Sequence, residues 1–193
     1  MKKSSSVSEC ALLFLFVFVV MLFATVNPVH GQDFREMTWG MTVDEVKEIE
    51  GMKVLDENEN MFVYAVKIAD REAILFYKHD NNKVVEGGYS FQQHYDDKND
   101  YVNEYEALKK ELTAEFGGPT IDEMLWKNDL YREDQDSLGL AVGMGYLIYW
   151  ADWEAGDTII ELALHGNNNL HVLAMNYASA TYEKSLLRRI ENR

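Results

Sequence analysis

The hydrophobic positions of this chain follow a period of two residues over much of its length. Such alternation is typical of strands that bury one face against a core. In the first half it predicts three hairpin-linked strands, over residues 61–69, 72–79 and 83–92. In the second half it predicts a short strand at 123–128 and an antiparallel meander over residues 145–153, 157–165 and 170–178.

Three other segments place their hydrophobic residues at helical spacing. The longest begins at Tyr101 and carries one apolar stripe as far as Phe116, where Gly117, Gly118 and Pro119 end it. We expect Asn99 or Asp100 to cap this helix. A short helix is predicted between Thr42 and Gly51, and a last one over residues 182–191.

The stretch "WGMTVDEVKEIEG", residues 39–51, specifies the short helix by itself. Thr42 and Glu45 fit a capping box, in which each side chain bonds the other residue's backbone N–H. Met41 and Val46 occupy the positions of a hydrophobic staple, and Gly51 is a suitable C-terminal stop. Every polar residue here has a capping role, so we interpret the stretch as structural.

A helix followed by strands occurs twice along the chain. Antiparallel strands with one apolar face need helices to cover that face, so the predicted fold class is α+β: an antiparallel sheet packed on one face by helices. We predict one compact domain over residues 32–193, built from two tandem helix-plus-three/four-strand units. Their expected limits are 34–92 for unit one, 93–178 for unit two and 180–192 for the C-terminal helix.

Residues 1–31 have the pattern of a signal peptide. Lys2 and Lys3 precede an unbroken apolar run from Ala11 to Ala24, and small residues before Gln32 suit cleavage. The run is short for a membrane span, which needs roughly 20 apolar residues. We therefore expect export to the periplasm or the extracellular space, with no stable membrane span after cleavage. An uncleaved anchor is the alternative.

The charge of the chain restricts its partners. The formal net charge is −15, and removing a leader with two lysines and one glutamate makes it about −16. Nucleic acids and anionic membranes are bound by basic surfaces, so we expect no nucleic-acid partner. A strongly acidic surface suits a basic partner or cations, or serves solubility alone.

The opening of the short helix resembles that of the small outer-membrane assembly lipoproteins of the SmpA/OmlA (BamE) type. Gly40, Met41, Thr42, Val46 and Gly51 match their Gly-Met-Thr, Val and Gly positions, although Met52-Lys53 replaces the expected x-Pro. "EFGGP" at 115–119 supplies the Gly-x-Pro ending in the second unit, which lacks the Gly-Met-Thr opening. Cys10, the single cysteine, precedes the apolar run, so a lipid attachment site is missing.

The tandem arrangement of the two units is similar to that of secreted β-lactamase-inhibitor proteins. That likeness implies a concave sheet that holds a partner protein. It is a resemblance in the pattern of elements, and fold alone does not determine function.

The strand predicted at 145–153, "GYLIYWADW", is rich in aromatic residues on both faces. Alternation points Tyr146, Ile148 and Trp150 one way, and Leu147, Tyr149 and Trp153 the other. A central strand buried on both sides would explain this pattern. Alternatively, one face remains open and presents aromatic side chains to a partner, since Tyr and Trp are favoured at interface hot spots. On that hypothesis the possible partner-binding residues are Tyr149, Trp150 and Trp153.

Other chemistry has weaker support. His165 and His171 flank a turn and could meet Glu161 as metal ligands, if the hairpin register puts all three on one face. The acidic runs at 96–100 and 132–137 both fail the EF-hand template. No catalytic or phosphate-binding motif occurs, so we expect a protein that is not an enzyme, with no catalytic residue, no cofactor and no bound metal.

These observations favour an exported, non-catalytic binding protein that engages an envelope or extracellular protein through an aromatic sheet face. A small-molecule or metal-ion binding protein of the cell envelope is the alternative. The oligomeric state is left open by the sequence.

Overall fold

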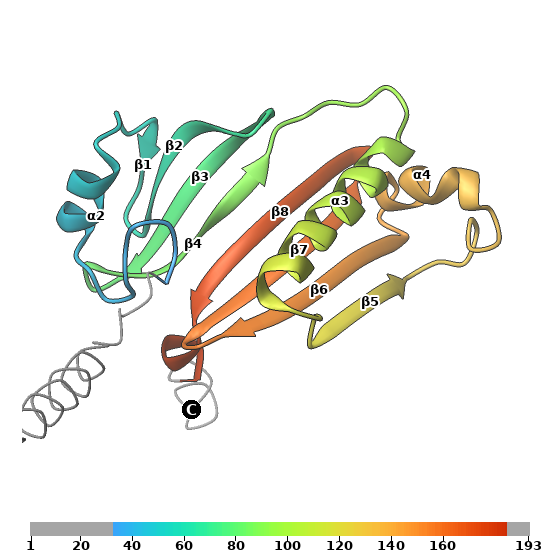
Figure 1. Cartoon of the computed structure of the whole chain (residues 1–193). Helices are drawn as coiled ribbons and strands as arrows, with labels where there is room; N and C mark the ends of the chain where they lie inside the picture. Colours follow the sequence, from blue (N-terminus) through green and yellow to red (C-terminus); the bar gives the residue numbers. More distant parts are fainter. Residues whose placement is uncertain (1–32, 185–193) are drawn as a thin grey trace, which may run out of the picture. The chain divides into compact units, whose positions relative to one another are not determined.

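The structure, a computed structural model, describes residues 33–184. These residues form one eight-stranded antiparallel sheet with the strand order β1-β2-β3-β4-β8-β7-β6-β5 (Figure 1). The predicted α+β fold class is confirmed. The strands are β1 Asp56–Glu57, β2 Met61–Ile68, β3 Arg71–Asp80, β4 Lys83–Phe91, β5 Ile121–Trp126, β6 Leu147–Ala155, β7 Thr158–Asn167 and β8 Leu170–Ser179. The helices are α2 Val43–Glu50, α3 Asn99–Phe116 and α4 Leu138–Gly143, with a single 3-10 turn at Gln135–Ser137.

The first four strands and the last four form two halves of this sheet. They meet where β4 pairs with β8, in a register that sets Glu86 opposite Ala178 and Ser90 opposite Ala174. Each half begins with a helix, α2 or α3, and continues into its strands. The last strand of each half therefore lies at the centre of the sheet, and β1 and β5 lie at its edges.

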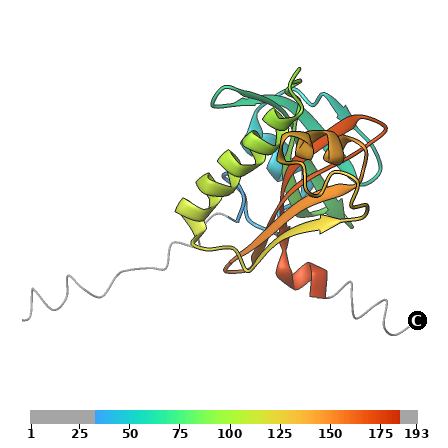
Figure 2. The same cartoon turned by 90° about the vertical axis from the view of Figure 1, so that its right-hand side faces the viewer.

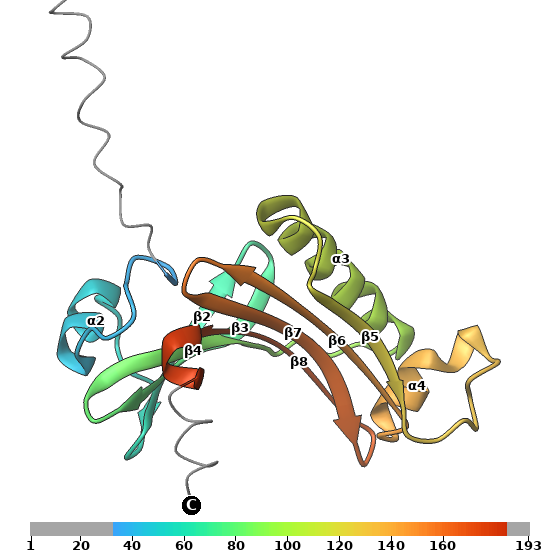
Figure 3. The same ribbon diagram turned by 90° about the horizontal axis from the view of Figure 1, so that it is seen from below.

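Helices cover one face of the sheet, which we call the covered face. In Figures 2 and 3, α3 runs along strands β6–β8 on the convex side of the sheet. The ring of Tyr105 on α3 lies 5.2 Å from that of Tyr149 on β6, and both side chains are buried. Leu108 and Leu112 continue the same buried stripe, as the helical spacing predicted. Burying this stripe against the sheet is the main source of stability for α3.

The segment before α2 covers the other half of the same face. The ring of Phe34 lies 4.7 Å from that of Tyr177 on β8 and 5.7 Å from that of Tyr77 on β3. Arg35 donates to the Glu50 carboxylate at 2.7 Å, and the hydroxyl of Tyr77 donates to the same carboxylate. The side chain of Glu50 is nearly buried, so these partners offset the cost of removing its charge from water.

Local sequence signals determine the ends of α2. Thr42 and Glu45 form the predicted capping box, in which the Thr42 hydroxyl accepts from the Glu45 amide and the Glu45 carboxylate accepts from the Thr42 amide. Gly51 ends the helix in the left-handed conformation at φ 60°. Both predictions from the stretch at residues 39–51 are confirmed.

Gly87 and Gly88 in β4 allow other groups to approach closely. A Cβ atom on Gly87 would lie 2.6 Å from the ring of Phe34, and one on Gly88 would overlap the carbonyl oxygen of Met175 on β8. The sequence was compatible with either a bulge or a close approach by another element at Gly87 and Gly88, and the structure shows the close approach. The register shift of β4 lies elsewhere, where His79 pairs with Val84.

Two features differ from the sequence-based expectations. Helix α3 begins at Asn99, and its first turn is met by Asp97, whose side chain accepts from the Asn99 amide at 2.9 Å. The expected caps, Asn99 and Asp100, already lie inside the helix. Asn99 instead joins α3 to the unpredicted helix α4, because its side chain accepts from the Gly139 amide at 2.7 Å and donates to the Asp136 carbonyl at 2.8 Å.

Residues 1–31, predicted as a signal peptide, lie outside the described residues. Residues 180–184 are helical, and the rest of the predicted C-terminal helix also falls outside. Between residues 33 and 184, no helix combines the length and the apolarity that crossing a membrane requires.

Candidate functional site

The face of the sheet opposite α2 and α3 carries the candidate site, and we call it the open face. The pairing register lines up a row of its residues across the strands: Gly88, Asn176, Glu161, Asp152 and Ile121. Along β6, covered-face residues are buried from Leu147 to Trp153, whereas open-face residues keep partial exposure as far as Asp152 and Glu154 is exposed. One face of the sheet is thus covered by helices, and the other is accessible to solvent.

The three aromatic residues predicted for partner binding are divided between the two faces. Tyr149 and Trp153 are 4% and 1% exposed, because α3 and the chain after it cover them. The indole N–H of Trp153 donates to the Gly117 carbonyl at 3.0 Å, which fixes it in the core. Both are therefore core residues, and the prediction that they contact a partner is wrong for these two. Trp150 lies on the open face and is partly exposed.

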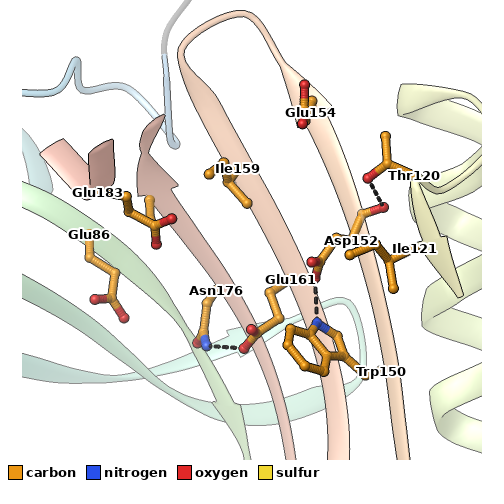
Figure 4. A pocket seen from close by; sticks show the side chains of 11 residues that line it. Glu86, Thr120, Ile121, Trp150, Asp152, Glu154, Ile159, Glu161, Asn176 and Glu183 are labelled. Carbon is orange, nitrogen blue, oxygen red and sulfur yellow. Dashed lines mark hydrogen bonds between the residues drawn. The ribbon is translucent and has the colours of Figure 1, made fainter. Parts of the chain in front are cut away.

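A depression of about 420 Å³ lies on the open face beside Trp150 (Figure 4). Residues from β4, β5, β6, β7 and β8 line it, together with Thr120 just before β5 and one of the helical residues 180–184. Its side chains are mainly acidic and apolar. They belong to Glu86, Thr120, Ile121, Trp150, Asp152, Glu154, Ile159, Glu161, Asn176, Ala178 and Glu183.

Five carboxylates define the charge of this acidic depression: Glu86, Asp152, Glu154, Glu161 and Glu183. Among the residues that the structure describes, no lysine or arginine lines it. One cation lies beside it, since Lys78 on β3 pairs with Glu86 at 2.6 Å. The remaining carboxylates leave a concentrated negative charge on a partly desolvated surface.

Partial burial raises the pKa values of three of these carboxyl groups, and repulsion from neighbouring carboxylates adds to this effect in two of them. Burial is the main cause of the raised pKa of Asp152, which a hydrogen bond from Trp150 partly opposes. Burial also raises the pKa of Glu161 and of Glu183, and in both cases the charge of Asp152 raises it further. A cation placed among these groups would offset the repulsion and lower these pKa values, because an opposite charge favours the ionised form.

Hydrogen bonds hold the carboxylates of Asp152 and Glu161 in place. The indole N–H of Trp150 donates to Asp152 at 2.5 Å, and the side-chain amide of Asn176 donates to Glu161 at 2.9 Å (Figure 4). Each carboxylate keeps further acceptor positions, since an ionised carboxylate can accept about four hydrogen bonds. The arrangement is suited to accept hydrogen bonds from ammonium or guanidinium groups.

The possible metal-ligand group of His165, His171 and Glu161 does not form. His165 and Glu161 share the open face of β7, whereas His171 pairs with Gly166 and lies on the covered face. There His171 stacks on Tyr101, with 4.1 Å between ring centroids, and bonds the Gly139 carbonyl at 2.8 Å. Burial lowers its pKa. Within residues 33–184, no three His, Cys, Asp or Glu side chains are grouped as metal ligands.

The acidic runs have structural roles in the described chain. Asp134 accepts from the Asp136 amide at 3.1 Å and from the Ser137 hydroxyl at 2.7 Å, which closes the 3-10 turn before α4. Asp97 serves the start of α3 in the same way. These side chains are used by local turns, as is common for aspartate at such positions.

The carboxylates of the acidic depression form no motif in the sequence. They come from positions between 86 and 183, so only the sheet register brings them together. One local signal was available: Trp150, Asp152 and Glu154 follow a period of two and therefore share a face of one strand. No family model, curated protein or solved structure matched the chain.

Proposed function

We propose that this chain is an exported, non-catalytic binding protein that engages a basic segment of another envelope or extracellular protein through the open face of its sheet. The observation that carries the proposal is the acidic depression with Trp150 at its margin. Trp150 supplies a large apolar surface with a polar edge, and the carboxylates supply charge. Tryptophan is enriched among the residues that dominate binding energy at interfaces.

Charge favours a basic partner. The whole chain carries a formal net charge of −15, so a cationic protein would be attracted before contact. On contact, a lysine or arginine beside Asp152 and Glu161 would replace like-charge repulsion by attraction. An arginine could also stack on the exposed part of Trp150, because its guanidinium is attracted by the indole face.

The shape of the surface favours a protein segment over an enclosed ligand. The depression is open and continues to β5, where Ile121 and Leu125 are 40% and 36% exposed. Small-molecule sites usually bury most of the ligand. A volume of about 420 Å³ still falls in their size range, so a small cationic molecule is the second candidate.

The proposed location and relatives come from the sequence. The apolar run at 11–24 supports export, and the Gly-Met-Thr start before α2 supports a likeness to the BamE type. A sheet of two helix-led halves is in keeping with the tandem arrangement that the β-lactamase-inhibitor likeness implies. These remain parts of the proposal.

The experiment begins with a tagged chain crosslinked in envelope extract, followed by purification of the retained protein and measurement of its dissociation constant. We expect Trp150→Ala and Glu161→Gln each to weaken binding about tenfold, a loss of roughly 1.4 kcal/mol. Glu48→Gln and Glu115→Gln are matched controls, because these exposed residues lie on α2 and α3. Equal affinity of all four variants would refute the proposed surface.

The two candidate functions give different results in this experiment. A protein partner should be retained with an affinity that falls as salt is raised, since exposed charges are screened over about 10 Å at 0.1 M ionic strength. A small cationic ligand should be found by mass spectrometry of the protein eluted under denaturing conditions, with no retained protein that depends on Trp150.

A further inference from the structure

Strand β5 has one unpaired edge. Within residues 33–184 it pairs with β6 alone, from Ile121 opposite Asp152 to Trp126 opposite Leu147. Five of its six residues are exposed, including Met124 at 48%. A free edge presents backbone donors and acceptors that can pair with another extended chain.

The two edges of the sheet are not equivalent. The other edge strand, β1, has only two residues, Asp56 and Glu57. Strand β5 has six residues, no proline, no lysine and an uninterrupted register with β6. Short length, proline, lysine and bulges are the usual devices that protect edges from pairing. Strand β5 lacks these devices and carries only the charges of Asp122 and Glu123.

The register indicates which backbone groups face outward. The Lys127 amide donates to the Tyr146 carbonyl at 2.7 Å, just beyond the last pair of the two strands. Because inward and outward N–H groups alternate along an antiparallel strand, the amides of Met124 and Trp126 point away from β6. Within residues 33–184 no strand lies on that side of β5, so both amides can donate to a chain placed along this edge.

The free edge adjoins the acidic depression. Thr120 and Ile121 line both, and Glu123 lies opposite Trp150 across the β5–β6 pair. A strand added beside β5 would place every second side chain on the open face, in rows that continue to Trp150 and Asp152. Basic side chains in those rows would meet Glu123 first and the depression beyond it.

We propose that the basic segment of the partner binds in extended form and adds a ninth strand to the sheet at the free edge of β5. The inference rests on the proposed function and specifies its binding mode. Backbone hydrogen bonds to β5 would supply affinity, and alternate side chains would supply specificity. A second copy of this chain is a poorer occupant, because pairing β5 with itself brings Asp122 and Glu123 together on two acidic molecules.

The test uses the full chain and a synthetic peptide of about ten residues that alternates lysine with threonine or valine, within the usual length of a strand. Met124→Pro removes an outward N–H, and proline is tolerated on an edge strand where the N–H faces solvent. Met124→Ala is the matched control, because it removes the side chain but keeps the N–H. We expect Met124→Pro to weaken peptide binding at least about tenfold and Met124→Ala to change it less than about threefold.

Hydrogen exchange gives a second readout that does not depend on a variant. On peptide binding, the amides of Met124 and Trp126 should become protected in the wild-type chain. Circular dichroism shows whether the sheet of Met124→Pro is intact. If this variant loses both its sheet and its binding, hydrogen exchange of the wild-type chain decides the question.

The outcomes separate this inference from the proposed function. Peptide binding that needs Trp150 but ignores Met124→Pro and leaves the β5 amides unprotected would overturn strand addition and retain the acidic surface. Absence of peptide binding at low salt would overturn both. A shift of the free chain to a dimer that Met124→Pro abolishes would overturn the choice of partner.

Discussion

The indole N–H of Trp150 donates to the carboxylate of Asp152, two residues further along the same strand and on the same open face. The bond fixes the ring beside a carboxyl group whose pKa is raised, chiefly by burial. An apolar surface and a charge are thereby held together at the margin of the acidic depression. Two residues of β6 thus supply both kinds of contact that a basic segment requires.

Trp150 should matter for binding more than for stability. Its ring is partly exposed, so Trp150→Ala removes less buried surface than truncation of a core residue does. We expect a loss of less than about 2 kcal/mol in the free energy of unfolding, measured by urea denaturation. Trp150→Phe should keep most of the binding. If Trp150→Phe bound as weakly as Trp150→Ala, the effect would instead come from the indole N–H and its bond to Asp152.

Trp153 should behave in the opposite way. It is 1% exposed and donates to the Gly117 carbonyl, so Trp153→Ala leaves a cavity and an unpaired carbonyl under α3. Urea denaturation should show a loss of about 3–5 kcal/mol. A stability close to that of the wild type would contradict the assignment of Trp153 to the core.

The carboxylates of the depression should make stability depend on pH. The folded-state pKa of Glu161 is raised, so its contribution favours the folded state below the unfolded value near 4.5 and is lost as the pH rises through the raised value. Glu161→Gln should therefore be more stable than the wild type at pH 7 and should lose this advantage near pH 4. Partial exposure limits the gain to roughly 1 kcal/mol, about 2–4 °C in melting temperature.

Thermal melts of both chains between pH 4 and pH 8 check the sign of this effect. Glu48→Gln, on the exposed side of α2, is the control for removing one carboxylate outside the acidic depression. A wild-type chain that gains stability over Glu161→Gln as the pH rises would contradict the raised pKa of Glu161.

The junction between the two halves should tolerate no side chain at Gly88. A Cβ atom there would overlap the Met175 carbonyl, so Gly88→Ala must displace β4 from β8. We expect a loss of at least about 2 kcal/mol in stability, or failure to fold. Gly118→Ala is a suitable control, because no atom lies within 4 Å of its added Cβ. Equal stability of the two variants would argue against this junction.

Loss of the cap of α2 should have a moderate and local effect. Thr42→Ala removes the hydroxyl that accepts from the Glu45 amide, which typically costs about 1 kcal/mol. Thr42→Ser keeps the acceptor and should lose less. Hydrogen exchange of the first turn of α2 should be faster in the alanine form than in the serine form.

Features set by local chemistry could be predicted from the sequence. The capping box of Thr42 and Glu45, the stop at Gly51 and the apolar stripe of α3 each depend on neighbours within about four residues. Strand alternation also assigned Trp150 and Trp153 to opposite faces of β6 before the structure was known.

Features set by the register and by helix docking could not be predicted. Alternation along β6 does not say which of its faces α3 covers, so it could not separate buried Tyr149 from partly exposed Trp150. Helix α4 was missed because it depends on Asn99, a residue 40 positions before Gly139, for its first hydrogen bond. The acidic depression was missed for the same reason, since its carboxylates come from distant strands.

Carboxylate footprinting tests the central claim most directly. A carbodiimide and an amine label accessible carboxyl groups of the full chain, with and without the retained partner, and mass spectrometry reads the rate at each residue. We expect slower labelling at Glu154, Glu161 and Glu183 when the partner is bound, and unchanged rates at Glu48 and Glu115. Protection of Glu48 and Glu115 with unchanged labelling in the depression would contradict it, because binding would then use the helical side of the molecule.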